Sequence, residues 1–446
     1  MSLSIRVPYV IAAPLFALPL LLLSTFSAAF AQDTWTTPLA TKLGVTLEKT
    51  FDSNGPDGWD PKKHPLVFVS TEGPGYGGLL SGVTLPGIAI IDADTREPVA
   101  SQHYDVLAWG WKNVFEDHGV GVSQDGKWIY LPTGEGTFGT EGAGRLLIIN
   151  ARTLKLDKVL HAKGNPHHVK VLNTPDGRHL VMSYGWSQPL FVMDPAQDNK
   201  VVGGADLNEI GIDSYLFFAS PDGDEIIASS RNRSAGRDRE NVDNAMVRIS
   251  TKDWSVINKI PIRDSNPVWA AFSVDNRYAY FTGADTSRIY KYDRKADKVI
   301  GIARAGVEGP YGVHFGWNDK ELYVVGKGEA SHNRGKVLGL VDAALIDKSD
   351  RPIDQFVTNC VRGDHGTLHP DPDANELWIS CNSSFEVVVF DLDRKEVTKR
   401  IPMPNGGSSH SGAFVQYDGW SGDVLSDQNG LHSVALKKKR ELLGVK

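Results

Sequence analysis

The sequence has little cysteine, no excess of positive charge and no catalytic motif of the common hydrolases. Only 2 of its 446 residues are Cys, which excludes a disulfide-dense scaffold and a four-cysteine zinc or iron–sulfur site. The formal charge of −7 makes nucleic acid and anionic membranes poor electrostatic partners. Neither a Gly-x-Ser-x-Gly elbow nor a His-Glu-x-x-His helix occurs. Hydrophobic residues make up 41% of the chain, enough for a globular core.

The first 31 residues have the pattern of a secretory signal peptide. Arg6 supplies a short positive region, residues 10–26 are apolar, and Ala29-Phe30-Ala31 is a small-residue cleavage site. An uncleaved membrane anchor is the alternative. No later apolar run has the length of a membrane span, so we expect no membrane insertion after cleavage. The hypothesis is a periplasmic or secreted protein, with bacterial and eukaryotic export both left open.

A pattern of about fifty residues recurs after the signal segment. Each copy opens on a short anchor, continues as alternating apolar residues, and reaches an Asp-Gly or similar turn before a second strand. Successive anchors are 43 to 54 residues apart; they are His118, His167, Tyr215, Val268, Tyr311, His365 and His410. Seven such units predict an all-β chain folded as a seven-bladed β-propeller.

The ends of the repeat region predict how the propeller closes. The seventh copy has too little chain for a whole blade, and the missing strands are expected at 66–69, 88–91 and 98–103. Pairing of N- and C-terminal strands would close the ring and remove its edges. We therefore expect a propeller over 32–430 and a C-terminal tail over 431–446 whose basic residues are solvated. Two smaller β domains are the alternative.

Histidine is concentrated at the anchors, although the chain has only 13 in all. In a propeller the first strand of each blade lines the central channel, so the anchors should meet at one mouth. Seven histidines lie at or near anchors, and we predict them as metal ligands: His118, His167, His168, His314, His365, His369 and His410. A nearly all-imidazole set favours copper, with more than one ion, and zinc is the second choice.

The neighbours of these histidines add further expectations. Asp117 and Asp364 would accept the second ring N–H of a ligating histidine. Because side chains alternate along a strand, only one of His167 and His168 is expected to face inward. Blades three and four offer Tyr215 and Trp269 instead of histidine, and core packing is the expected role of both. These expectations describe a pocket with no thiolate ligand.

Two features lie outside the anchors. The polar run 231–244 is expected to be a solvated loop, and the functional alternative makes it a loop over the channel mouth with Glu240 as the catalytic base. Cys360 and Cys381 flank the segment that carries His365 and His369. In an exported chain they are expected to pair and to fix that segment.

The motifs resemble a known group of copper enzymes. Asn165-Pro166-His167-His168, the following Thr174-Pro175-Asp176-Gly177 and the Asp-His-Gly openings resemble the histidine-rich propeller of nitrous-oxide reductase, and more closely that of thiocyanate dehydrogenases. The resemblance covers roughly residues 64–420. It implies copper ligands at His118, His168, His314, His365 and His410. We expect no cupredoxin domain, which argues against nitrous-oxide reduction.

Together these observations predict an exported copper-dependent oxidoreductase acting on a small inorganic sulfur or nitrogen substrate. Electrons would leave to an external acceptor such as a periplasmic cytochrome. A non-catalytic binding or scaffold propeller, a metal-dependent hydrolase or lactonase, and a haem d1 protein are the alternatives. Calcium sites of hydrolases prefer carboxylate and amide ligands, which this histidine set does not supply.

Overall fold

The computed structural model describes residues 34–74, 85–111, 114–115, 118–135, 142–186, 188–230, 244–262, 266–328, 335–404 and 407–445. Three sequence predictions fall outside these ranges: the signal peptide, the carboxylate of Asp117 and the catalytic base Glu240. Residues 35–446 make one compact unit, which contains every strand and helix named below.

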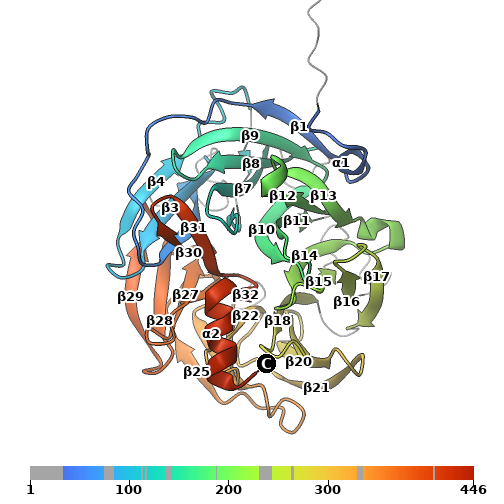
Figure 1. The fold of residues 1–446 in the computed structure, drawn as a ribbon. Helices are drawn as coiled ribbons and strands as arrows, with labels where there is room; N and C mark the ends of the chain where they lie inside the picture. The colour runs from blue at the N-terminus through green and yellow to red at the C-terminus, as the bar shows by residue number, and fades with distance from the viewer. Residues whose placement is uncertain are drawn as a thin grey trace, which may run out of the picture. The chain divides into compact units, whose positions relative to one another are not determined.

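The strands of this unit form seven antiparallel sheets (Figure 1). We number the sheets in the order in which their inner strands, the strands nearest the middle of the molecule, follow one another along the chain. Sheet 1 contains β1 (Val45–Thr50), β5 (Val114–Phe115), β6 (Gly121–Val122), β7 (Trp128–Glu135), β8 (Gly144–Asn150) and β9 (Lys155–Ala162). Sheet 2 contains β10 (Asn165–Asn173), β11 (His179–Trp186), β12 (Leu190–Asp194) and β13 (Lys200–Ala205). Sheet 3 contains β14 (Ser214–Ala219), β15 (Glu225–Ser230), β16 (Ala245–Ser250) and β17 (Val256–Pro261).

The remaining sheets repeat this order. Sheet 4 contains β18 (Pro267–Phe272), β19 (Tyr278–Gly283), β20 (Arg288–Asp293) and β21 (Lys298–Arg304). Sheet 5 contains β22 (Pro310–Phe315), β23 (Glu321–Gly326), β24 (Val337–Asp342) and β25 (Asp354–Val357). Sheet 6 contains β26 (Gly363–Leu368), β27 (Glu376–Cys381), β28 (Glu386–Asp391) and β29 (Glu396–Pro402). Sheet 7 contains β2 (Leu66–Pro74), β3 (Gly87–Asp92), β4 (Pro98–His103), β30 (Gly407–Asp418), β31 (Ser421–Asp427) and β32 (Gly430–Leu431).

Burial increases from the last strand of a sheet to the first. The inner strands β14, β18, β22 and β26 are buried along their whole length, whereas β17 and β21 are largely exposed or half-buried. Figure 1 places β10, β14 and β18 toward the middle and β9, β17 and β21 toward the outside. Apolar side chains on both faces of the sheets pack against neighbouring sheets, as antiparallel layers with two covered faces require.

The recurring Asp-Gly motif is the turn between the first and second strands of a sheet. At its end, Gly126, Gly177 and Gly223 have positive φ angles of 69°, 83° and 65°, which glycine adopts without steric cost. In the turn before β7, the Asp125 carboxylate accepts the Ser123 hydroxyl at 2.7 Å. In the equivalent turns of sheets 4, 5 and 6 the residue with positive φ is Asn276, Asp319 or Asn375, residue types that tolerate this conformation.

Sheet 7 joins the two ends of the described chain. β2 pairs with β30, with Leu66 opposite Val415 and Ser70 opposite His410, as the sequence predicted. The sequence did not predict the next strand. β31 lies on the other side of β30, with Phe414 opposite Ser426, and pairs in turn with the short edge strand β32.

The segments at both ends of the unit pack onto the sheets. At the start, α1 (Pro38–Lys42) precedes β1, and β1 pairs with β9. At the end, α2 (Ser433–Leu443) buries Ala435 and Lys439. The prediction of a solvated basic tail is therefore wrong for Lys439, whose ammonium donates to the Gly316 carbonyl at 2.9 Å and pairs with Asp319 at 3.0 Å.

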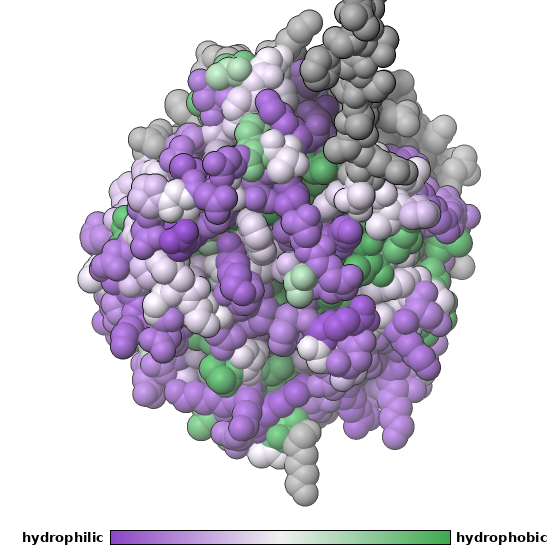
Figure 2. Space-filling model, turned by 45° about the horizontal axis from the view of Figure 1, so that its top comes forward, coloured by the Kyte–Doolittle hydropathy of each residue, from purple (hydrophilic) through white to green (hydrophobic). Residues whose placement is uncertain are grey.

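The exterior of the unit is mostly polar. The face in Figure 2 is largely hydrophilic, with small separate apolar areas. Among the described residues, no helix has the length and apolar character needed to cross a membrane. Most apolar side chains therefore lie between the sheets. Many of the buried polar side chains lie in or beside the inner strands.

Candidate metal centre

The inner strands carry an irregularity at the position of the anchors. The pairing register shifts between Pro166 and His168 in β10, and the same shift occurs at the start of β14, β18, β22 and β26. Such β-bulges re-aim side chains and are frequent beside functional sites. The bulge in β10 breaks the alternation of the strand. The expectation that only one of its two histidines faces the site is wrong, because both belong to the cluster.

Five of the seven predicted histidines lie together. The ligand atoms of His118, His167 and His168 are all within 4.8 Å of one another. The rings of His118 and His167 stack with centroids 3.6 Å apart and an interplanar angle of 15°. His118 also belongs to a second group with Asp364, His365 and His410 at the same spacing. The five imidazoles come from sheets 1, 2, 6 and 7 and are buried.

Asp364 is the carboxylate of this cluster. Its Oδ2 lies 3.0 Å from Nδ1 of His410 and 3.3 Å from Nε2 of His118. A carboxylate accepts, so Nδ1 of His410 carries its hydrogen and leaves Nε2 as the lone-pair nitrogen. The other oxygen, Oδ1, pairs with the ammonium of Lys327 at 2.9 Å. The structure thus places Asp364 where the sequence predicted an acceptor for a histidine N–H.

The electrostatics of the cluster favour neutral imidazoles. Burial, together with neighbouring positive charge, holds the pKa of His118, His167 and His168 well below the usual range. Burial opposes ionisation of Asp364, but Lys327 and the histidines outweigh it and hold the pKa of Asp364 well below its usual range. Neutral imidazole is the form that binds metal. Near neutral pH, little proton competition is therefore expected.

The other two predicted ligands each direct a ring nitrogen to a backbone group and not to the cluster. His314 Nε2 accepts the backbone N–H of Gly366 at 2.9 Å, and burial lowers its pKa to about 3. His369 Nδ1 accepts the backbone N–H of Asp371 at 3.1 Å, and its ring packs against Phe414. Neither belongs to the two groups whose ligand atoms converge. His314 nevertheless lies next to the site, because its ring centroid is 5.6 Å from that of Trp269 and its partner Gly366 follows His365.

The opposite side of the cluster is aromatic. Tyr215 places its hydroxyl 3.3 Å from Nε2 of His167 and against the hydroxyl of Tyr311. Trp269 lies nearly parallel to His365, with ring centroids 5.1 Å apart. These residues were expected to pack in the core. They do so, and they also form one wall of the site.

Two lysines at the site were not identified from the sequence. Lys327 pairs with Asp364 and lies 4.1 Å from the centroid of the Tyr311 ring. Lys170 is 1% exposed and lies over the rings of Phe218 and Trp269 at 3.7 and 4.7 Å. Burial holds the pKa of Lys170 well below its usual range. A single lysine in a strand (Lys170) or directly after one (Lys327) gives no sequence signal that separates it from ordinary surface residues.

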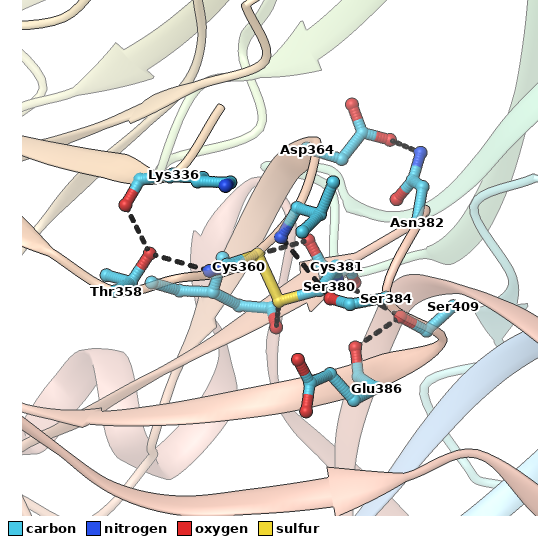
Figure 3. The surroundings of a disulfide bond; sticks show 12 residues. Lys336, Thr358, Cys360, Asp364, Ser380, Cys381, Asn382, Ser384, Glu386 and Ser409 are labelled. Atoms are coloured by element: carbon cyan, nitrogen blue, oxygen red, sulfur yellow. Dashed lines mark hydrogen bonds between the residues drawn. A yellow bond between two sulfur atoms is a disulfide. The ribbon is translucent and has the colours of Figure 1, made fainter. Parts of the chain in front are cut away.

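A disulfide lies beside the strand that carries Asp364 and His365. Cys360 and Cys381 are bonded, as predicted (Figure 3). Cys381 pairs with Gly363 at the start of β26, and its N–H donates to the Ser409 hydroxyl, next to His410, at 3.2 Å. Asn382 donates to Asp364 Oδ2 at 3.2 Å. The disulfide therefore fixes the backbone beside β26, which carries Asp364 and His365, and beside β30, which carries His410.

The C-terminal segment lies against the other ends of the inner strands. A pocket there is lined by the ends of the inner strands, among them His314 of β22, by residues 427–432, which include Gln428, and by α2. Gln428 reaches His168, with Oε1 2.6 Å from Nδ1. This contact spans 260 residues of sequence, and no sequence motif points to it.

The geometry fits a metal ion. Nε2 of His168 is buried and has no hydrogen-bond partner among the described residues, an arrangement that costs free energy unless another group uses the lone pair. Gly119 leaves room for the two histidine strands to approach, because a Cβ there would lie 2.2 Å from Nδ1 of His168. Imidazoles with one carboxylate are ligands that copper and zinc accept. The cluster can therefore hold a metal, whose identity the donor set alone does not decide.

The comparisons with known proteins give the fold. Neither protein-family models nor curated proteins match the sequence. Solved structures do, including dihydro-heme d1 dehydrogenase NirN in complex with DHE, at 14% identity over 86% of this chain and 75% of that chain, with a TM-score of 0.53. Another is hydrazine synthase from Kuenenia stuttgartiensis, at 14% identity over 78% of this chain and 99% of that chain, with a TM-score of 0.51. These similarities agree with a β-propeller fold and, at such identities, carry nothing about activity.

Proposed function

We propose that the protein is an exported copper-dependent oxidoreductase whose centre is held by His118, His167, His168, His365 and His410 in a closed seven-bladed propeller. The observation that carries the proposal is the convergence of five buried histidines from four sheets. Supporting closure, β30 contacts β6 just as the other inner strands contact their neighbours. The two ligand groups share His118, which supports more than one ion.

The chain's own residues prepare the site for this role. Asp364 accepts from His410 and so fixes the ring and its hydrogen; such partners tune ligand basicity. Lys327 balances the charge of that carboxylate. Tyr215 and Trp269 exclude water on the opposite side. When bound, copper would supply the capacity to accept single electrons from the substrate.

The proposed substrate is a small inorganic sulfur or nitrogen compound, as for the thiocyanate dehydrogenases that the motifs resemble. The buried position of all five histidines supports a small substrate. Electrons would pass to an external acceptor such as a periplasmic cytochrome. The disulfide is consistent with export. Glu240 is kept as the proposed base, and a zinc centre is the second choice of metal.

Metal analysis tests this proposal. The purified chain is reconstituted with Cu²⁺, desalted and measured by plasma mass spectrometry and electron paramagnetic resonance. We expect at least about one copper per chain, with nitrogen hyperfine structure from imidazole. The double variant H118Q/H410Q should lose the metal, whereas H179Q should keep it, because His179 is bonded to Asn173 away from the cluster.

Other outcomes would replace the proposal. Less than one copper or zinc per reconstituted chain would contradict it and favour a binding or scaffold propeller. A hydrolytic activity that depends on calcium would favour the hydrolase or lactonase alternative. Strong visible absorbance after incubation with haem d1, retained in H118Q/H410Q, would favour a haem protein.

A further inference from the structure

The C-terminal segment reaches the metal centre from the other ends of the inner strands. Gln428 lies in the turn between β31 and β32 and is 2% exposed. Its Oε1 is 2.6 Å from Nδ1 of His168. An amide oxygen only accepts, so this contact requires a hydrogen on Nδ1. The lone pair of His168 is then on Nε2, the buried nitrogen for which no described residue is a hydrogen-bond partner.

The turn that carries Gln428 is anchored on both sides. The Asp427 carboxylate accepts the N–H of Val171 at 3.0 Å and lies 2.8 Å from His432. Asn429 donates to the Val171 carbonyl at 3.2 Å. These bonds connect the turn to β10, the strand that also carries His168. Hydrogen bonds to β10, the strand of His168, therefore hold the turn with Gln428 beside His168.

The helix that follows holds the segment in place. In α2, Lys439 donates to Gly316, and Arg440 donates to the Val274 carbonyl at 3.2 Å and pairs with Asp222. These partners lie at the ends of inner strands of sheets 3, 4 and 5 or in the turns that follow them. The contacts distribute the anchoring over three sheets. The side chain of Gln428 is thus presented by a fixed backbone.

We infer that Gln428 is a positioning residue of the metal centre: it fixes the Nδ1–H tautomer of His168 and thereby presents Nε2 as the ligand atom. The consequence for metal binding rests on the proposed function, whereas the tautomer does not. In metal sites the partner of the second ring nitrogen decides the tautomer and orientation of a ligating histidine. Loss of such a partner costs about 10- to 100-fold in metal affinity.

The first test uses the metal-free protein. Histidine labelled with ¹⁵N in both ring positions is introduced, and the His168 signals are assigned by their loss in H168Q. Long-range ¹H–¹⁵N spectra separate the two neutral tautomers directly. We expect His168 to carry its hydrogen on Nδ1. A hydrogen on Nε2, or an equal mixture of tautomers, would overturn the inference whatever the metal content of the chain.

The second test uses substitutions at Gln428. Q428L keeps the size and removes the acceptor, so we expect mixed tautomers and copper affinity lower by about 10- to 100-fold in chelator competition. Q428E keeps an acceptor oxygen and should restore the tautomer and most of the affinity. If Q428L does not fold, Q428E and the wild-type spectrum still decide the question.

The matched control is Q124L. Gln124 is also buried and also contacts the C-terminal strand, donating to Asp423 at 2.6 Å and to the Val424 carbonyl at 2.9 Å. Its amide oxygen accepts from Asn173 at 3.0 Å rather than from a histidine, so Q124L should leave tautomer and affinity unchanged. Equal losses in Q124L and Q428L would mean that the segment acts only through stability, which overturns the assignment. Wild-type protein that binds no copper but shows the Nδ1–H tautomer would refute the proposed function and leave the assignment of the His168 tautomer to Gln428 standing.

Discussion

The channel lining has two halves that use the same backbone for different chemistry. Sheets 6, 7, 1 and 2 present histidines, whereas sheets 3 and 5 present Tyr215 and Tyr311 at anchor positions and sheet 4 presents Trp269 one residue after its anchor. The same register shift occurs in inner strands of both halves. The backbone irregularity therefore aims a side chain inward, and the residue type alone decides whether that side chain can ligate or only enclose.

The halves also differ in the groups that surround a buried charge. In the histidine half, Asp364 of sheet 6 is ionised and is paired with Lys327, which follows β23 of sheet 5; both side chains are nearly inaccessible to solvent. The aromatic half encloses the Lys170 ammonium among rings, with one long hydrogen bond of 3.4 Å to the Phe217 carbonyl. A buried pair is costly to break, while ring contacts are individually weak. The histidine half should therefore be the more sensitive to substitution.

The largest expected effect comes from breaking the buried pair. D364N removes the charge that balances Lys327 and should lower the free energy of unfolding of the metal-free protein by about 3–5 kcal/mol. Guanidinium denaturation followed by tryptophan fluorescence measures the change. The double variant D364L/K327M removes both charges and should recover part of the loss. A D364N protein as stable as wild type would remove the energetic contrast between the halves.

The disulfide should give the next largest effect. Cys360 and Cys381 are 21 residues apart in sequence, and loss of a bridge closing such a loop costs about 3 kcal/mol in the chain-entropy model. C360S/C381S should therefore unfold at lower denaturant and, because the bridge lies beside β26, bind copper more weakly. Wild-type protein in reductant serves as the control and should match the variant. Lower stability with unchanged copper affinity would separate the bridge from the site.

Lowering the pH should reduce the stability of the folded protein through His314, a histidine of the aromatic half. His314 in β22 has a folded pKa of about 3, below the ordinary value of about 6.5 for the unfolded chain. The unfolded state therefore binds the proton first, and stability is lost as the pH falls below about 6.5. From about pH 7.5 to about pH 5.5 this group alone should cost about 1.4 kcal/mol.

The comparison with H314Q isolates that contribution. Unfolding free energies of the metal-free proteins are measured at both pH values. The wild type should lose about 1.4 kcal/mol more than H314Q, since the other buried histidines are common to both. An identical loss in the two proteins would mean that His314 is protonated in the folded state.

The sequence predicted the half of the site that repeats and missed the half that does not. The spacing of the anchors located His118, His365 and His410, because a propeller brings equivalent positions of successive sheets together. It also proposed His314 and His369, which lie in or directly after inner strands but accept backbone hydrogen bonds instead. The repeat spacing indicates which end of a strand lies near the site. It does not indicate which side chains of that strand point toward the site.

The missed features depend on backbone irregularity and long-range contact. The bulge in β10 directs both His167 and His168 to the cluster, and nothing in Asn165-Pro166-His167-His168 marks a bulge. Gln428 and Lys327 reach the site through β31 and sheet 5, from segments that carry no histidine motif. Alternation and motif rules describe regular strands, so they fail where the fold departs from regularity to build a site.

The smallest expected effect sharpens the comparison most directly. Y215F removes one hydroxyl from the aromatic half, where it contacts His167 Nε2 and the Tyr311 hydroxyl. A buried hydrogen bond of this kind contributes about 1 kcal/mol, so stability should fall by about that amount. The copper content should stay at the wild-type value, because the phenol encloses the site and supplies no ligand in the proposed centre. If Y215F lost copper as H118Q/H410Q is expected to, the aromatic half would belong to the ligand set, and the division of the lining into ligating and enclosing halves would be wrong.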